Sequence, residues 1–418
     1  MLYFEYFNDR HGKKEKAEAT KEIKHFTLHK GCYISNFEYS DMSDKNKRLR
    51  KTAKKIDQNR ILQEDTPFFS LSDAAEFITG YIQSTKDWKT GKNISYQESI
   101  SIKIENISDY VNHIYKLTDE NIINDVGRRK VYYFRGQAKY YFRGQAKEES
   151  EIIPSLARFA EKKEVKECEG IDANNGQHST FININNLDQI EGELIAEAQL
   201  RFPDIFSKNL LPAELLCLLQ HYGIPTRMLD ITENALVALY FACVSESKDE
   251  KDSDGEVIVF SDFRNTKISP PMINAIADFY SFGSDTLDNF IEKAREKPYF
   301  LKFKKDTDTD EEWVRKCCEE YVLFLSSPIR TTRQMTQQGR YILFPNAISD
   351  YSPKLSFNCK INPIPKDHIC IEKLLIIPKD KKEDMLKQLR SVGINKFSLF
   401  PDSIDKMAEW IKENYKYI

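Results

Sequence analysis

The chain has 418 residues, with 62 Lys and Arg against 65 Asp and Glu, a formal net charge of −3 and 40% hydrophobic residues. That length fits roughly two domains, or one large domain with insertions. The apolar fraction is sufficient for a sizeable core, which excludes a collagen-like or wholly disordered chain. The near-neutral charge argues against a general nucleic-acid coat protein, because such proteins carry a strong basic excess.

Neither a membrane segment nor a metal site is expected. The longest apolar run, Ala235 to Val244, is too short to span a bilayer, and the N-terminus lacks the basic-then-apolar pattern of a signal peptide. The eight cysteines are scattered without Cys-x-x-Cys spacing, which disfavours structural zinc. We therefore expect a reduced, cytoplasmic protein that uses no metal.

Residues 1–100 differ from the rest and are predicted to form a charged, partly helical N-terminal region. Their most basic stretch, Lys45 to Lys55, has two open interpretations: a solvated helix face in a mobile arm, or a contact for the phosphates of a nucleic acid. Ser72 to Ile82 has the pattern of an amphipathic helix with Ser72 as its N-cap.

Residues 101–418 are predicted to form one core. Ile107 to Leu117 places its apolar residues on one helical face. Leu211 to His221 is a predicted helix that ends at Gly223, and Thr232 is placed to cap a second helix, Glu233 to Val244. Strands are predicted over 101–104, 130–134, 256–260, 340–344 and 373–377, loops or turns over 170–188, 248–255 and 304–312, and a last helix over 403–415.

Short strands mixed with helices, in no regular βαβ alternation, predict an α+β fold with a mixed or antiparallel sheet flanked by helices.

One segment of the sequence is duplicated: Tyr132 to Lys139 is repeated immediately, letter for letter, as Tyr140 to Lys147. Two copies of eight residues do not make a solenoid. We interpret the repeat as a local duplication, in which one copy serves the original site and the other forms a bulged loop. The alternative is that both copies form working sites.

An ordered set of motifs resembles the FRG domain, a bacterial family named for its Phe-Arg-Gly motif. The set starts with the Phe-Arg-Gly-Gln at Phe142 and ends with the Leu-Phe-Pro-Asp at Leu399, covering roughly residues 101 to 410. The second copy of the duplicated segment stands at the family's usual distance from Pro154-Ser155, so Arg143 is preferred over Arg135. The other matching segments are Ile153 to Arg158, Gln220 to Asp230, Ala238 to Ala242 and Arg333 to Gly339.

The matched segments contain the candidate ligand-binding residues. A planar guanidinium such as that of Arg143 suits a phosphate, and pairing with Asp230 is the structural alternative. His221, at a helix C-terminus, is equally compatible with catalysis and with a capping role. Polar groups between apolar elements form either a site or a structural network, and these candidates are Gly144, Gln145, Thr226, Arg227, Asp230 and Arg333.

The same order of motifs bears a more distant resemblance to arginine-class ADP-ribosyltransferases, which would imply a fold like theirs. The resemblance implies that Arg143 holds NAD, that Thr232 braces the first strand, and that Gln337 or Gln338 stands where the transferase glutamate contacts the ribose. Gln337 departs from that pattern, because an amide cannot stabilise an oxocarbenium-like transition state as a carboxylate does. Loss of one such contact costs about 10²–10³ in rate.

Three functional hypotheses follow. The first is an intracellular bacterial enzyme that consumes NAD or transfers ADP-ribose, acting as an effector in phage defence or toxin-type conflict. The second is a non-catalytic module that senses a nucleotide or binds a protein partner or regulator. The third is a nucleic-acid-binding protein that uses Lys45 to Lys55. Phosphate-loop, nucleophile-elbow and zinc-protease motifs are absent from the sequence.

Overall fold

The structure is a computed structural model. It describes residues 1–22, 25–39, 42–52, 56–81, 88–126, 140–148, 151–159, 187–261, 270–282, 286–301, 311–319, 322–325, 331–351, 354–357 and 361–401. The predicted strand at 130–134 and helix at 403–415, Arg135 with the first copy of the duplication, and most of the loops at 170–188 and 304–312 lie outside these ranges.

Within the described residues, the first 100 form an antiparallel sheet in the order β4-β3-β2-β1-β5. Its strands were missed because β2 reads Lys-Glu-Lys-Ala-Glu-Ala-Thr-Lys, and only Ala17 and Ala19 turn inward. The elements are β1 (Leu2–Phe7), β2 (Lys14–Lys21), β3 (Phe26–Leu28), β4 (Thr66–Phe68), β5 (Trp88–Thr90), α1 (Asp44–Thr52), α2 (Leu71–Thr79) and α3 (Tyr96–Ile100).

The predicted cap of α2 was wrong by two residues. The helix begins at Leu71, and the hydroxyl of Ser70, not of Ser72, accepts the backbone N–H of Asp73. Ser72 instead donates both its N–H and its hydroxyl to Asp367. The helix ends at Gly80, whose φ of 89° is a left-handed conformation that glycine adopts at low cost.

The basic stretch forms helix α1, and internal contacts hold its side chains. Arg50 is buried and donates to the carbonyls of Phe37, Phe77 and Ile78. Lys45 lies 2.8 Å from the carboxylate of Asp73, and Arg48 pairs with Glu319 of α13. These cations tie α1 to neighbouring elements, so the mobile-arm interpretation is wrong for the described part of the stretch.

The remaining chain is built around a mixed sheet in the order β10-β11-β8-β7-β9-β14-β6, antiparallel except for the parallel pair β14 and β6. The predicted α+β class is confirmed. A separate hairpin pairs β12 with β13. The strands are β6 (Ser101–Lys103), β7 (Tyr140–Gln145), β8 (Met228–Thr232), β9 (Gly255–Ser261), β10 (Leu323–Leu325), β11 (Gly339–Leu343), β12 (Ile348–Tyr351), β13 (Lys354–Phe357) and β14 (Ile371–Ile377).

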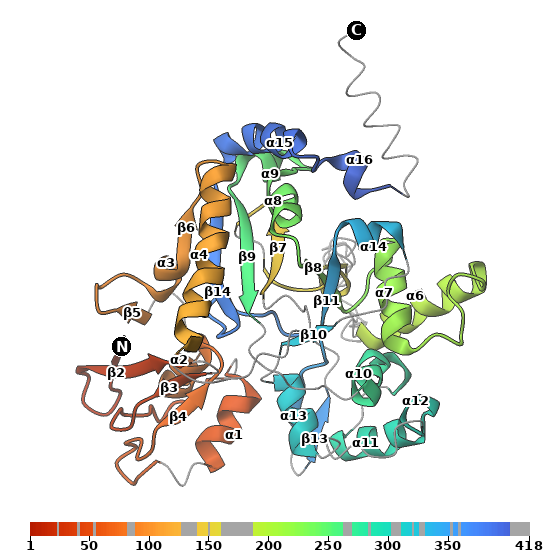
Figure 1. The fold of residues 1–418 in the computed structure, drawn as a ribbon. Helices are drawn as coiled ribbons and strands as arrows, with labels where there is room; N and C mark the ends of the chain where they lie inside the picture. The colour runs from red at the N-terminus through yellow and green to blue at the C-terminus, as the bar shows by residue number, and fades with distance from the viewer. Residues whose placement is uncertain are drawn as a thin grey trace, which may run out of the picture.

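Alternation along the strands divides the core between the two faces of this sheet. Ile258 and Leu374 pack with the N-terminal sheet, whereas Val257, Val259 and Leu375 pack beneath α4, α8 and α15. Figure 1 shows the N-terminal elements in red and orange below α4, and α15 with α9 at the opposite end. The helices here are α4 (Ile107–Val126), α8 (Ala235–Cys243), α9 (Lys248–Asp252), α15 (Lys382–Ser391) and α16 (Lys396–Leu399).

A helical layer covers β8, β10 and β11 through a third cluster that contains Met228, Leu343 and Phe290. Helix α7 ends with Gly223 at φ 79°, as its sequence predicted. The predicted turn at 248–255 was wrong in part, because Ser247 and Glu250 form a capping box that starts α9. The helices of this layer are α6 (Leu187–Arg201), α7 (Pro212–His221), α10 (Pro270–Ala277), α11 (Leu287–Glu296), α12 (Pro298–Leu301) and α13 (Glu311–Glu319). Helix α14 (Thr332–Thr336) contacts β11 and α16.

Two glycines let α8 pack directly on the sheet. A Cβ at Gly144 of β7 would overlap the carbonyl oxygen of Ala238, and one at Gly255 of β9 would overlap that of Ala242. Ala238 and Ala242 are one helical turn apart and fully buried. The glycine of the Phe-Arg-Gly motif therefore serves helix packing.

We predict that Gly144→Ala destabilises the protein by about 3 kcal/mol or more, because the clash is with backbone atoms that cannot rotate away. Urea unfolding followed by circular dichroism measures the change. Gly91→Ala is the matched control, since a Cβ there meets nothing within 4 Å. Equal unfolding midpoints for the two variants would contradict this account of the packing.

A buried carboxylate joins the N-terminal region to the core. Asp367 is fully buried, and its oxygens accept from Ser72 N at 2.7 Å and Ser72 Oγ at 3.0 Å. Burial raises the pKa of Asp367 to about 7, and the nearby charge of Asp73 adds to the rise while the bonds from Ser72 oppose it. The folded protein therefore holds this proton more tightly than the unfolded chain.

We predict that this residue makes stability fall as the pH rises from about 4 to 7, because over that window the unfolded chain has lost the proton that the folded state retains. The unfolding free energy of wild type, relative to Asp367→Asn, should drop by up to about 4 kcal/mol across the window. Denaturant titrations at several pH values test it. Asp204→Asn, at an exposed position, is the control, and parallel profiles for wild type and Asp367→Asn would contradict the prediction.

Candidate functional site

Three neighbouring strands bring most of the predicted site residues together. At the end of β8, Thr232 is paired with Gly339 of β11 on one side and with Phe142 of β7 on the other. A pocket of about 210 Å³ lies beside these positions. Of the predicted residues it is lined by Arg143, Gly144, His221, Asp230, Thr232, Arg333 and Gln337.

Arg143 is half-buried in this pocket and held by one bond, from its Nη1 to the backbone carbonyl of Asp230 at 2.8 Å. Its Nε is buried and has no hydrogen-bond partner in the described part of the chain. Burial lowers the pKa of Arg143 to about 10, although the charge of Asp230 raises it. The side chain is still protonated at neutral pH, so the pocket contains a cation with an unsatisfied donor.

The carboxylate of Asp230 is oriented by Gln220, the next-to-last residue of α7. Gln220 Nε2 donates to Asp230 Oδ2 at 2.7 Å, while its Oε1 accepts from Thr226 Oγ1 at 2.9 Å and from Ser155 Oγ at 3.1 Å. Asp230 is the one acidic side chain among the described residues that line the pocket. It is exposed and does not form the predicted alternative, a buried ion pair with Arg143.

Thr232 and Gln337 are in the pocket wall, and the protein itself engages both. The hydroxyl of Thr232 donates to the carbonyl of Gln337 at 2.6 Å and accepts from the N–H of Asn234 at 3.0 Å. Gln337 Nε2 donates to the carbonyl of Leu399 at 2.9 Å. Thr232 is not the predicted N-cap of α8, because Asn234 caps that helix through its bond from Leu236 N. Gln338, the alternative to Gln337, is exposed at φ 47° and does not line the pocket.

His221 and Arg333 form a second polar wall where α7 meets α14. His221 Nδ1 lies 3.3 Å from Thr331 Oγ1, and the His221 carbonyl accepts from Arg333 Nη1 at 3.3 Å. The Arg333 guanidinium carbon lies 4.6 Å from the centre of the Phe400 ring. With Arg143, the pocket therefore contains two arginines and one carboxylate, which favours an anionic ligand.

Three predicted ligand-binding residues do not reach the pocket lining. Gln145 is buried and donates to Glu256 Oε2 at 3.0 Å. Thr226 is buried, and its hydroxyl bonds Gln220 and accepts the N–H of Met228. Arg227 is fully buried and packed against the ring of Phe279. These side chains build the scaffold behind the site.

Arg227 is the centre of a buried ion cluster. Its guanidinium donates to Glu191 at 2.7 Å, Asp188 at 2.9 Å and Asn346 at 2.8 Å. Burial alone would lower the pKa of Arg227, but the carboxylates of Glu191 and Asp188 raise it above its usual value. Asn346 in turn donates to Asp188 at 2.8 Å, so the cluster cross-links α6, the start of β8 and the segment after β11.

We predict that Arg227→Leu destabilises the protein by about 3–5 kcal/mol, because two buried carboxylates lose their cation. Thermal and urea unfolding measure the loss. Arg201→Ala, which removes an exposed i,i+4 pair with Glu197, should change stability little. An unfolding midpoint for Arg227→Leu close to that of Arg201→Ala would show that the cluster does not hold the fold.

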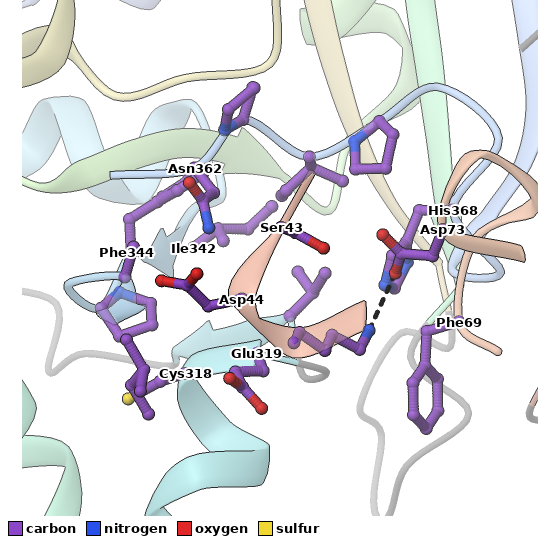
Figure 2. Close-up of a pocket in the computed structure, with 18 of the residues that line it drawn as sticks. Ser43, Asp44, Phe69, Asp73, Cys318, Glu319, Ile342, Phe344, Asn362 and His368 are labelled. Carbon is purple, nitrogen blue, oxygen red and sulfur yellow. Dashed lines mark hydrogen bonds and ion pairs between the residues drawn. The ribbon is translucent and has the colours of Figure 1, made fainter. Parts of the chain in front are cut away.

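A second, larger pocket of about 390 Å³ lies where α1 and α2 meet the segment after β11. Figure 2 shows Asp44, Asp73 and Glu319 around it, with a dashed line to Asp73 marking its bond from Lys45. The other two carboxylates are paired as well, Asp44 with Lys47 at 3.7 Å and Glu319 with Arg48 and Arg315. The charges that line the larger pocket therefore neutralise one another. For that reason we place the candidate site in the smaller pocket.

The roles of Gln220 and of the Leu399-Phe400 segment were not predicted from the sequence. Both were part of the family resemblance, and the signal available for Gln220 was a polar residue at the end of an apolar helix, six positions before Thr226.

Among the described residues there is no cluster of His, Cys, Asp and Glu that could hold a metal ion. The described helices include none with the length and apolarity needed to cross a membrane.

Comparison with protein families gives one match, to the FRG domain, over residues 138–251. The matched segment runs from β7 through α7, β8 and α8, and therefore supplies Arg143, His221, Asp230 and Thr232 of the pocket. The residues from α14, β11 and α16 lie beyond it. Neither a curated protein nor a solved structure matches the chain.

Proposed function

The chain contains an FRG domain, and we propose that its pocket binds a phosphate-bearing nucleotide such as NAD. The observation that carries the proposal is the guanidinium of Arg143, which lines the pocket and whose buried Nε has no partner among the described residues. A phosphate oxygen is a strong acceptor for such a donor, and a planar guanidinium can bind it at two points.

The size of the pocket limits how much of the ligand it encloses. At about 210 Å³ it is smaller than the ~300–1,000 Å³ of pockets that enclose a drug-sized molecule. We propose that it holds one phosphate with the adjoining ribose or base, and that the rest of a dinucleotide extends outside. Arg143 and Arg333 would face the phosphate, while Phe241 and Val237 supply the apolar wall.

Binding without turnover has the better physical support. A transferase-like role would require Gln337 to contact a ribose hydroxyl, and its Nε2 already donates to the carbonyl of Leu399, which leaves Oε1 for that contact. The hydroxyl of Thr232 is likewise engaged on both sides. A sensing module needs neither group, because Arg143 and Arg333 supply the charge for an anion.

Turnover of NAD is a second candidate, favoured by one observation. Asp230 is an exposed carboxylate whose orientation is fixed by Gln220, and it lies beside Arg143. In this proposal Asp230, rather than Gln337, stabilises the positive charge that develops on the ribose as nicotinamide leaves. A protein acting in this way would deplete NAD, as an effector in bacterial conflict does.

We predict that NAD binds the wild-type protein and that Arg143→Lys weakens binding about tenfold or more, because lysine keeps the charge but loses the two-point donor geometry. Isothermal titration calorimetry measures the dissociation constant. Arg135→Lys, in the identical upstream octapeptide, is the control and should bind as wild type does. Absence of any NAD or ADP-ribose binding by the wild-type protein would refute the proposal.

Release of nicotinamide separates the two candidates. If the protein turns NAD over, chromatography will detect nicotinamide, and Asp230→Asn will slow its release about 10²–10³-fold while leaving NAD bound. If the pocket only senses the ligand, no nicotinamide appears with either protein.

A further inference from the structure

The C-terminal segment reaches back to the pocket and contacts two of its polar side chains. Helix α16 starts with a capping box at Asn395, and Leu399 and Phe400 are both buried. The carbonyl of Leu399 accepts from Gln337, and the ring of Phe400 lies under the guanidinium of Arg333. Figure 1 shows α16 next to α14, the helix that carries Arg333.

The ring of Phe400 is fixed from its other side. It meets Phe241 of α8 edge to face, with ring centres 6.1 Å apart and an interplanar angle of 86°. Phe241 lines the pocket, and α8 packs on β7 through Gly144. The aromatic face offered to Arg333 is therefore held by the same sheet that carries Arg143.

An arginine at the edge of a pocket has many rotamers, and ordering it on binding reduces affinity. Here the guanidinium of Arg333 is held on the Phe400 ring, at 4.6 Å, while its Nη1 donates to the carbonyl of His221. A cation–π contact attracts the guanidinium to the ring face and does not itself neutralise the positive charge. Arg333 is thus ordered before any ligand arrives.

We propose that Phe400 is a positioning residue, which presents the charge of Arg333 to the anionic part of the ligand. This inference rests on the proposed function for the identity of the ligand, NAD, and on the contacts of the C-terminal segment for the mechanism. It extends the site beyond the family-matched segment 138–251 to a residue about 150 positions further along the chain, well outside that match.

The test compares two replacements of Phe400 that both keep a large side chain: leucine, which is aliphatic, and tyrosine, which is aromatic and adds one hydroxyl. Phe400→Leu retains burial but removes the aromatic face, whereas Phe400→Tyr retains the face. NAD affinity should fall about five- to tenfold in Phe400→Leu and remain within twofold of wild type in Phe400→Tyr. In the double variant Arg333→Ala with Phe400→Leu, the second change should add nothing, because both remove one contact. Phe397→Leu, on the same short helix but exposed, is the control.

A second measurement needs no ligand. Phenylglyoxal modifies accessible arginines, and mass spectrometry follows each site. Phe400→Leu should speed modification of Arg333 severalfold, Phe400→Tyr should not, and the exposed Arg201 should be unchanged in both. If the variants show this reactivity pattern but the wild-type protein does not bind NAD, the proposed ligand is refuted and the role of Phe400 is not. Equal reactivity and equal affinity in the leucine and tyrosine variants would overturn the role of Phe400.

Discussion

The buried guanidinium of Arg227 is the interaction on which the geometry of the site depends. It lies one residue before β8 and is bonded to Asp188 and Glu191 of α6 and to Asn346 after β11. Its own carbonyl accepts the N–H of Phe344, which continues the register of β11 against β8. Asp230 and Thr232 follow in the same strand, so the cluster fixes where the pocket lies relative to the helical layer.

Strand β8 also connects the buried scaffold to the side chains that line the pocket. Asp230 contributes its carbonyl to Arg143 and its carboxylate to Gln220, whose other amide atom bonds the two hydroxyls of Ser155 and Thr226. Within this hydrogen-bond network Arg143 Nε is a buried donor that has no partner among the residues that the structure describes. Buried polar groups in folded proteins are almost always paired, and this exception belongs to a residue that lines the pocket, which supports our proposal that a ligand acceptor binds there.

Sequence patterns predicted helix α7 and strand β11 of the site but not strands β7 and β8, which carry Arg143 and Asp230. They also could not separate Arg143, which lines the pocket, from Arg227, which is buried behind it. Arg143 and Arg227 both stand at strands within polar motifs, and what separates them is a pair of acids on α6, 39 and 36 positions before Arg227. No periodicity links residues that far apart. The N-terminal strands were missed for a related reason, because β2 turns only two alanines inward and its outer face is charged. The core strands β9 and β14 were predictable, since each contains an uninterrupted apolar run, Val257 to Phe260 in β9 and Leu374 to Ile377 in β14.

The polar side chains of the pocket differ in what they bind, and this difference explains why an ordered pocket need not catalyse a reaction. Thr232 and Gln337 use their side chains to join β8, β11 and α16, which stabilises the wall at the expense of direct contact with a ligand. Arg143 is instead held by a bond to the backbone carbonyl of Asp230, and the contacts of Arg333 include the carbonyl of His221 and the ring of Phe400. A pocket whose neutral groups are committed to structure and whose cations face the cavity is suited first to recognising an anion. Chemistry on that anion then depends on Asp230 alone, because it is the only carboxylate in the described lining.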